Sequence, residues 1–260
     1  MFFGYVFWLL DILHRVCYNT RRMNVDSEKA RIKAEYARRD SDARLAGLYD
    51  RLEPAVIYIR HEIERHIALF LKRKGLRGAD LSEARLLDAG CGGGTFFNMF
   101  ISLGLRPQNL YGAELLFERL HAAKKAAASD FKIVNADAAA LPFKDSSFDF
   151  VSQFTVFSSV LSANARIAIA SEMRRVAKNG GYIVSYDMQH TDPFNKNLAP
   201  LKFGQLKDIF GARPEACWRI VPNPLLLRRL VKHSKLLCDL ISALKIFNSF
   251  NIAFIRVEKY

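Results

Sequence analysis

The residues best suited to chemistry lie in the stretch LLDAGCGGGTFF, residues 86–97. Two leucines lead to an acid, Asp88, and glycines follow at Gly90, Gly92 and Gly94. Glycine accepts positive φ angles and lets a ligand approach the main chain closely. The start of the next helix presents free N–H groups to a polar ligand. The stretch therefore predicts a strand, a tight glycine turn and a helix start that bind a polar group.

The spacing of these glycines separates the nucleotide sites that use such a turn. A dinucleotide site has G-x-G-x-x-G and an acid about 20 residues later, whereas this run is G-x-G-x-G with Asp88 directly before it. A phosphate-binding P-loop ends in Lys and Ser or Thr, and Thr95-Phe96 supplies no lysine. A protein that binds NAD stays open as an alternative, with Glu114 as its ribose ligand.

Apolar runs and helix-like segments alternate through the central region. Strands are expected near 85–89, 109–113, 131–135, 147–154 and 180–187, and helices near 94–103, 115–127 and 163–177. This alternation predicts a parallel, doubly wound α/β sheet with right-handed crossovers. Ligands of such sheets bind at the carboxyl ends of the strands, so polar residues at several strand ends should meet in one crevice.

Four motifs in order, over roughly residues 84–190, resemble those of class I S-adenosylmethionine-dependent methyltransferases. The glycine run resembles motif I, where the acid and glycines hold the methionine end of the cofactor. YGAELL resembles the second strand, which implies that Glu114 binds the ribose hydroxyls. NADAAALPF resembles the turn after the third strand, where Asp137 meets the adenine amino group and the N–H of Ala138 a ring nitrogen. SFDFVSQF resembles the fourth strand, and EMRRVAKNGGYIVSYD the helix, turn and fifth strand that follow.

The resemblance implies S-adenosylmethionine as cofactor, S-adenosylhomocysteine as product and a Rossmann-like, seven-stranded, mostly parallel sheet. It divides the chain into an N-terminal helical lid, residues 1–80, and a methyltransferase domain, residues 81–260, with a helical insertion at about 222–247. Lid contacts are expected from Tyr36, Arg38, Tyr49 and Arg60. The implied cofactor-binding residues are Asp88, Gly90, Cys91, Gly92, Gly94, Glu114, Leu115, Asp137, Ala138 and Gln153.

Alignment of the acceptor supplies much of the catalysis of methyl transfer, which is an in-line displacement at a carbon activated by positive sulfur. A hydroxyl or amine acceptor also loses a proton, and His190, just beyond Asp187, is the candidate base, with a solvated loop histidine as the alternative. Many family members have a histidine after the fourth strand, but Ser158 and Ser159 occupy the matching positions here. The resemblance favours O- or N-methylation of a small molecule, glycan or secondary metabolite.

The formal net charge of +13 is concentrated outside the central region. Lys and Arg number 17 against 12 acids in residues 1–85, 10 against 9 in 86–190, and 12 against 5 in 191–260. Basic flanks attract phosphates, anionic lipids or acidic substrates without choosing among them. An RNA methyltransferase and a noncatalytic Rossmann-fold nucleotide-binding protein therefore stay open, although nucleic acid is not the favoured partner.

The first 18 residues are apolar and aromatic at helical spacing, but the run is too short to span a membrane. They predict an amphipathic helix that either packs on the domain or lies on a membrane surface through residues 1–20. The four cysteines are scattered, so we expect no metal site and no disulfide framework. A cytoplasmic location, with membrane association as the alternative, fits these features.

Overall fold

The computed structural model describes residues 27–42, 47–48, 50–120, 130–190 and 195–259 of the 260-residue chain. The amphipathic helix predicted for residues 1–18 lies outside these ranges. So do residues 121–127 of the helix predicted for 115–127. None of the described helices is both long and apolar enough to cross a bilayer.

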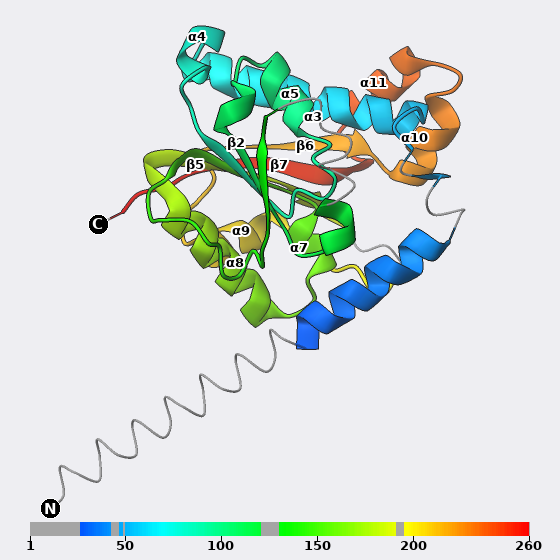
Figure 1. Ribbon diagram of the computed structural model, residues 1–260. Helices are drawn as coiled ribbons and strands as arrows, with labels where there is room; N and C mark the ends of the chain where they lie inside the picture. The colour runs from blue at the N-terminus through cyan, green and yellow to red at the C-terminus, as the bar shows by residue number, and fades with distance from the viewer. Residues whose placement is uncertain (1–26, 43–46, 49, 121–129, 191–194, 260) are drawn as a thin grey trace, which may run out of the picture.

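A seven-stranded sheet forms the centre of the molecule (Figure 1). Its order is β3-β2-β1-β4-β5-β7-β6, and β7 alone runs opposite to the other six strands. The predicted Rossmann-like, mostly parallel sheet of seven strands is thereby confirmed. The strands are β1 Leu86–Ala89, β2 Leu110–Glu114, β3 Lys132–Asn135, β4 Phe148–Phe154, β5 Ala177–Met188, β6 Ala216–Pro222 and β7 Asn248–Arg256.

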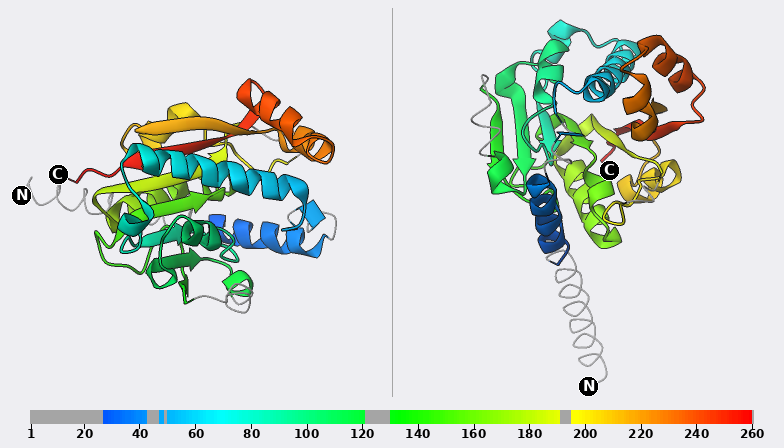
Figure 2. Two further views of the ribbon diagram at one scale, coloured as in Figure 1. Left: turned by 90° about the horizontal axis from the view of Figure 1, so that it is seen from above. Right: turned by 90° about the vertical axis from the view of Figure 1, so that its right-hand side faces the viewer.

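Helices cover both faces of this sheet, as Figures 1 and 2 show. On one face lie α3 Pro54–Arg73, α4 Gly78–Leu81, α5 Phe97–Ser102, α10 Pro224–Leu230 and α11 Lys235–Ala243; on the other lie α7 Val156–Ser159, α8 Ala163–Val176 and α9 Leu206–Phe210. Short 3₁₀ turns occupy Pro107–Asn109 and Phe203–Gln205. A further helix over 27–41 lies across the carboxyl ends of the strands.

The two cores follow from the alternation of side chains along each strand. On the α3 face, the Phe70 ring stacks on Phe254 of β7 at 4.0 Å between centroids. On the α8 face, Met173 and Ile183 are fully buried with Ile255. Since every central strand has apolar side chains on both faces, the sheet is rigid enough to hold its polar strand ends in place.

Two boundaries differ from the sequence prediction for a physical reason. The helix expected from residue 94 begins at Phe97, because Gly94 has a left-handed φ of 71° that continues the turn. The fifth strand begins at Ala177, directly after α8, whereas the prediction began it at residue 180. The predicted insertion at 222–247 contains α10 and α11, which lie between the two antiparallel strands β6 and β7.

Candidate active site

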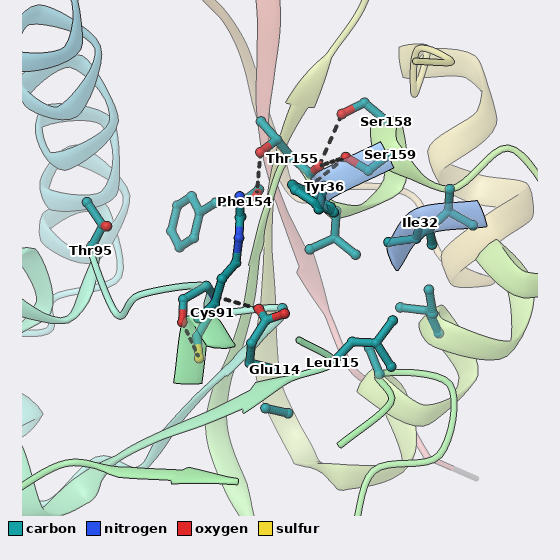
Figure 3. A pocket seen from close by; sticks show the side chains of 18 of the residues that line it. Ile32, Tyr36, Cys91, Thr95, Glu114, Leu115, Phe154, Thr155, Ser158 and Ser159 are labelled. Atoms are coloured by element: carbon teal, nitrogen blue, oxygen red, sulfur yellow. Dashed lines mark hydrogen bonds between the residues drawn. The ribbon is translucent and has the colours of Figure 1, made fainter. Parts of the chain in front are cut away.

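A cavity of about 650 Å³ lies at the carboxyl ends of β1, β2 and β4. The helix over 27–41 and the first turns of α3 also line it. In Figure 3, Cys91 and Glu114 stand on one wall, and Tyr36, Thr155, Ser158 and Ser159 on another. The topology therefore brings residues from both halves of the chain to one site, as expected for an open parallel sheet.

The glycine loop after β1 is shaped by its contact with the turn after β4. Gly90 and Gly92 have φ angles of 77° and 53°, in the left-handed region that glycine adopts without strain. A Cβ atom on Gly90 would lie 2.5 Å from Cγ2 of Val156, so only glycine fits there. Gly90, Cys91 and Gly92, together with Gly93 and Thr95, line the cavity, so the main chain of the loop faces a ligand directly.

Glu114, at the end of β2, is a buried carboxylate on the cavity wall. Its Oε2 atom accepts from the N–H of Gly92 and its Oε1 atom from the N–H of Leu116, both at 2.8 Å. A carboxylate offers about four acceptor sites, so two remain for ligand hydroxyls. Asn135 Nδ2 donates to the Glu114 main-chain oxygen at 2.8 Å and fixes the end of the strand. Leu115 lines the cavity beside it.

Asp137 and Ala138, after β3, also line the cavity. The Asp137 carboxylate accepts from the N–H of Ala139 at 2.9 Å and forms an ion pair with Lys29 Nζ at 2.8 Å. Lys29 comes from the helix over 27–41, so this contact links that helix to the third strand end. The sequence does not predict that Lys29 pairs with Asp137, because more than 100 residues separate the two.

Three of the predicted cofactor residues, Asp88, Gly94 and Gln153, do not line the cavity. Asp88 is fully buried behind the loop, where its Oδ1 atom accepts from Ser152 Oγ at 2.9 Å. Burial raises the pKa of Asp88 to about 7, and the nearby Glu114 charge adds to the rise. At neutral pH, Asp88 is therefore protonated to a much larger extent than an exposed aspartate.

Gln153 organises the turn that follows β4. Its Nε2 atom donates to Ser185 Oγ at 2.7 Å, and its Oε1 atom accepts from the N–H of Val156 at 2.9 Å. These bonds hold Thr155 in a left-handed conformation with φ 60°. Gln153 therefore shapes the cavity from behind, through Val156 and the glycine loop that Val156 contacts.

His190, the predicted base, is exposed and does not line the cavity. No histidine is among the described residues that do. Burial raises the pKa of the Cys91 thiol, so this cysteine is an un-ionised wall residue at neutral pH. Within the described ranges, no group of three or more His, Cys, Asp or Glu side chains is arranged to hold a metal ion.

The end of the cavity away from Asp137 has an aromatic wall, defined here as Phe96, Phe154, Tyr186 and Phe250. The Phe96 and Phe154 rings stack at 3.9 Å between centroids, and those of Tyr186 and Phe250 at 5.0 Å. Val56, Ile59 and Met188 extend this apolar surface. The Tyr186 hydroxyl is buried and has no hydrogen-bond partner among the described residues, and burial raises its pKa far above the ordinary value.

The helix over 27–41 is tied to the loops around the cavity. Glu28 accepts from the N–H of Leu161 at 2.5 Å, and Glu35 accepts from Asn197 Nδ2 at 2.7 Å. The Arg38 and Arg39 side chains also bond Glu35, and Arg38 is the largest cause that lowers its pKa to about 2.

Of the four predicted lid contacts, Tyr36 and Arg60 line the cavity, whereas Arg38 does not, and Tyr49 lies outside the described residues. The Tyr36 hydroxyl lies 3.2 Å from Ser159 Oγ, and the Arg119 guanidinium lies over its ring at 4.1 Å from the centroid. Arg119 lies in the helical residues after β2. It was not predicted from the sequence, because it belongs to no recognised motif.

Comparison with known proteins places this geometry in a family. A family profile described as a methyltransferase domain matches residues 87–185, which include β1, the glycine loop and the ends of β2 to β4. Residues 87–185 thus match a methyltransferase domain, in agreement with the class I S-adenosylmethionine-dependent motifs of the sequence. This match supports the prediction of S-adenosylmethionine as the cofactor.

A named relative supports this match over a limited length. The chain is 30% identical over 167 residues to a demethylmenaquinone methyltransferase of Staphylococcus aureus strain JH9. The match spans 63% of this chain and 65% of that relative, which is just under two thirds of its length.

Two solved structures show the fold alone, since their sequences are distant. A protein of Pyrococcus horikoshii has a TM-score of 0.52 at 15% identity and covers 73% of this chain and 86% of its own. The YcgJ protein of Bacillus subtilis has a TM-score of 0.52 at 16% identity, covering 75% of this chain and all of its own.

The cavity fits S-adenosylmethionine on two structural grounds. Above the loop, added Cβ atoms on Gly92 and Gly93 would meet nothing within 4 Å, so space for a ligand lies against the main chain. The buried Glu114 carboxylate keeps acceptor sites that no described residue fills. The predicted roles of Glu114 toward ribose hydroxyls, of the loop toward the methionine portion, and of Asp137 and Ala138 toward the adenine ring stay predictions, and all these residues line the cavity.

Proposed function

We propose that this protein transfers a methyl group to a small, flat and largely apolar acceptor that carries one polar or anionic group. The observation that carries the proposal is a single cavity in which the strand-end acids and glycine loop adjoin the aromatic wall. Such a wall stacks on a planar ring and excludes water from it. The demethylmenaquinone methyltransferase relative supports a ring-bearing small molecule as the acceptor.

A largely apolar acceptor suits this wall better than a glycan does. Val56, Ile59 and Met188 offer no hydrogen bonds to sugar hydroxyls, and unpaired hydroxyls are costly to bury. The polar side chains near the wall are few, chiefly the hydroxyls of Ser158 and Ser159 and the Arg60 guanidinium. These residues are suited to orienting one oxygen rather than many.

The Arg60 guanidinium is the cation best placed to receive that oxygen. It lines the cavity from α3, and it forms no ion pair or hydrogen bond with any other described residue. Arginine stays charged at physiological pH, so a half-buried guanidinium attracts an anionic or phenolic oxygen. The lack of a histidine on the described wall fits an acceptor that loses its proton easily, such as an acidic phenol.

The chain's own residues then act mainly by positioning. S-adenosylmethionine, when bound, supplies a methyl group that its positive sulfur activates. The aromatic wall holds the acceptor ring, and the helix over 27–41 excludes water from above. Alignment rather than proton transfer is the larger contribution in this scheme.

The test combines cofactor binding with acceptor choice. Calorimetry with S-adenosylmethionine, S-adenosylhomocysteine and NAD should show binding of the first two alone. Methyl-labelled S-adenosylmethionine is then offered with a short-chain naphthoquinol, a simple phenol, an oligosaccharide and RNA. We expect label on the ring compounds, and label only on the sugar or on RNA would contradict the proposal.

A matched pair of Phe→Leu variants locates the acceptor. Phe250→Leu, in the aromatic wall, should lower kcat/KM for the ring acceptor at least fivefold without changing S-adenosylhomocysteine affinity. Phe203→Leu, an exposed residue outside the cavity, should leave both values unchanged. Equal effects of the two substitutions would show that the ring does not bind at the wall.

A further inference from the structure

The helical segment between β6 and β7 exposes an unusual amount of apolar surface. Seven of the thirteen large apolar side chains exposed in the described structure lie in residues 224–247, with 41–73% of their surface accessible. Soluble proteins rarely expose so many large apolar groups together, and such patches mark binding surfaces. We name these seven the α10–α11 patch: Leu225, Leu236, Leu237, Leu240, Leu244, Ile246 and Phe247.

Packing on the inner side of α11 fixes the outward direction of these leucines. Cys238 is fully buried, and the Asp239 carboxylate accepts from the Tyr58 hydroxyl of α3 at 3.1 Å. Leu237, Leu240 and Leu244 recur at spacings of three and four, which places them on one stripe of the helix. The stripe faces solvent because the opposite side is held by α3.

The segment that contains the α10–α11 patch is also rich in positive charge. Residues 224–247 contain five Lys or Arg and one acid, Asp239, which Lys235 Nζ contacts at 2.7 Å. Arg229, Lys232, Lys235 and Lys245 are all exposed. A surface with apolar side chains and a local excess of four positive charges is complementary to anionic lipid headgroups above acyl chains.

The α10–α11 patch also lies close to the cavity. The start of α3 contacts the helical segment through Tyr58 and through the Glu53–Lys232 ion pair at 3.9 Å. Val56 and Ile59, in the same turns of α3, line the cavity. Figure 2 shows α10 and α11 beside this end of α3. An apolar molecule leaving a membrane at this surface would therefore reach the cavity past the first turns of α3.

We propose that the α10–α11 patch docks on a bilayer surface that contains anionic lipids. The leucines enter the boundary between headgroups and acyl chains, and the cations of the same segment meet lipid phosphates. The patch contains none of residues 1–20, for which the sequence predicts a separate amphipathic helix. Docking requires neither cofactor nor acceptor, so it can succeed or fail independently of the proposed methyl transfer.

Vesicle flotation of the full chain tests the proposal. The vesicles contain phosphatidylcholine alone or phosphatidylcholine and phosphatidylglycerol at three to one. We expect partitioning into the anionic vesicles, and a loss of at least tenfold in the Leu236→Gln/Leu240→Gln/Leu244→Gln variant. The control Ile167→Gln/Phe203→Gln changes exposed apolar residues on the α8 side and should partition like the unchanged protein.

A charge pair of variants separates lipid docking from general hydrophobic adhesion. Arg229→Gln/Lys245→Gln should weaken binding to anionic vesicles by about fivefold for each cation removed. Lys144→Gln/Lys207→Gln, at exposed positions elsewhere, is the control. Circular dichroism and S-adenosylhomocysteine affinity should match in all variants, because the changed side chains are exposed and outside the cavity.

Two outcomes would overturn the proposal. One is equal partitioning of the leucine variant and the unchanged protein. The other is no vesicle binding together with a concentration-dependent dimer in light scattering that the leucine variant abolishes, which would assign the patch to a second copy of this chain.

Discussion

The two ends of the cavity are built in different ways. The cofactor end uses main-chain groups of the glycine loop and acids at successive strand ends, Glu114 and Asp137, all within about fifty residues. The proposed acceptor end is the aromatic wall, whose four rings come from elements spread between Phe96 and Phe250. One end depends on strict backbone geometry and buried charge, the other on the shape of side chains.

This difference predicts different responses to substitution. Changes at the cofactor end should disturb folding and cofactor binding together, because Glu114 both faces the ligand and bonds the loop. Changes at the acceptor end should alter acceptor use and leave cofactor affinity alone. Substitutions at the two ends of the cavity test this difference, and the one at Gly90 should destabilise the protein most.

Gly90→Ala should be the most damaging small substitution. The new Cβ atom would lie 2.5 Å from Val156 Cγ2, at a position whose φ of 77° strains any other residue. Crowding and backbone strain together cost about 4 kcal/mol. We expect a folding defect of this size in urea denaturation and cofactor binding too weak to measure by calorimetry.

A second substitution tests whether the Val156 contact is the cause. Val156→Ala removes the clashing methyl group, so Gly90→Ala/Val156→Ala should recover roughly 2 kcal/mol, while the φ strain stays. Simple additivity of the two single changes would show that the glycine loop and the turn after β4 do not press on each other.

Asp88→Asn should change the pH dependence of stability. The pKa of Asp88 is raised from 3.8 to about 7, so the folded protein keeps a proton that the unfolded chain releases above about pH 4. The folded state therefore binds more protons between pH 4 and 7, and its stability falls as pH rises through that window. The asparagine variant lacks this loss. Between pH 4 and pH 8, its free energy of unfolding should therefore rise relative to that of the unchanged protein by on the order of 3 kcal/mol.

Urea denaturation at pH 4.5, 6 and 8 measures that difference. Asp187, whose pKa burial raises to about 6, contributes a slope of the same sign that both proteins share. Asp149→Asn, at a partly exposed aspartate bonded to Lys178, serves as the control. Parallel pH profiles for Asp88→Asn and the unchanged protein would mean that Asp88 is ionised when folded.

Glu114→Gln should weaken S-adenosylhomocysteine binding at least tenfold, or about 1.4 kcal/mol. The amide keeps the shape of the carboxylate but loses its charge and half of its acceptor sites for ribose hydroxyls. Glu118→Gln, an exposed residue four positions later, is the matched control. Calorimetry that gives equal affinities for the two variants would remove Glu114 from the cofactor site.

Much of the fold could be predicted because strands and helices alternate strongly, and each strand end with an acid was visible in the chain. The parallel, doubly wound sheet follows from local periodicity and short connections. The glycine loop could also be predicted, since only glycine tolerates its φ angles. The start of α5 at Phe97 was missed because three glycines in a row mask where a turn becomes a helix.

The acceptor end could not be predicted, because its contacts join distant segments. Phe96 and Phe154 read as ordinary core residues, and only the fold shows that both face a cavity. The Lys29–Asp137 ion pair likewise joins segments that are far apart in the sequence. His190 was chosen by its nearness in sequence to a strand end, yet the chain turns its side chain to solvent.

Two Tyr→Phe variants should change stability least, and they test whether the aromatic wall leaves a buried hydroxyl unpaired. Tyr186 in the aromatic wall buries a hydroxyl without a partner among the described residues, so Tyr186→Phe should stabilise the protein by about 1 kcal/mol. Tyr58→Phe removes a hydroxyl that donates to Asp239 at 3.1 Å and should destabilise it by a similar amount. Urea denaturation compares them, and S-adenosylhomocysteine affinity should be unchanged in both. If Tyr186→Phe is instead destabilising, its hydroxyl has a partner such as a bound water, and the aromatic wall then holds a polar point that an acceptor oxygen can replace.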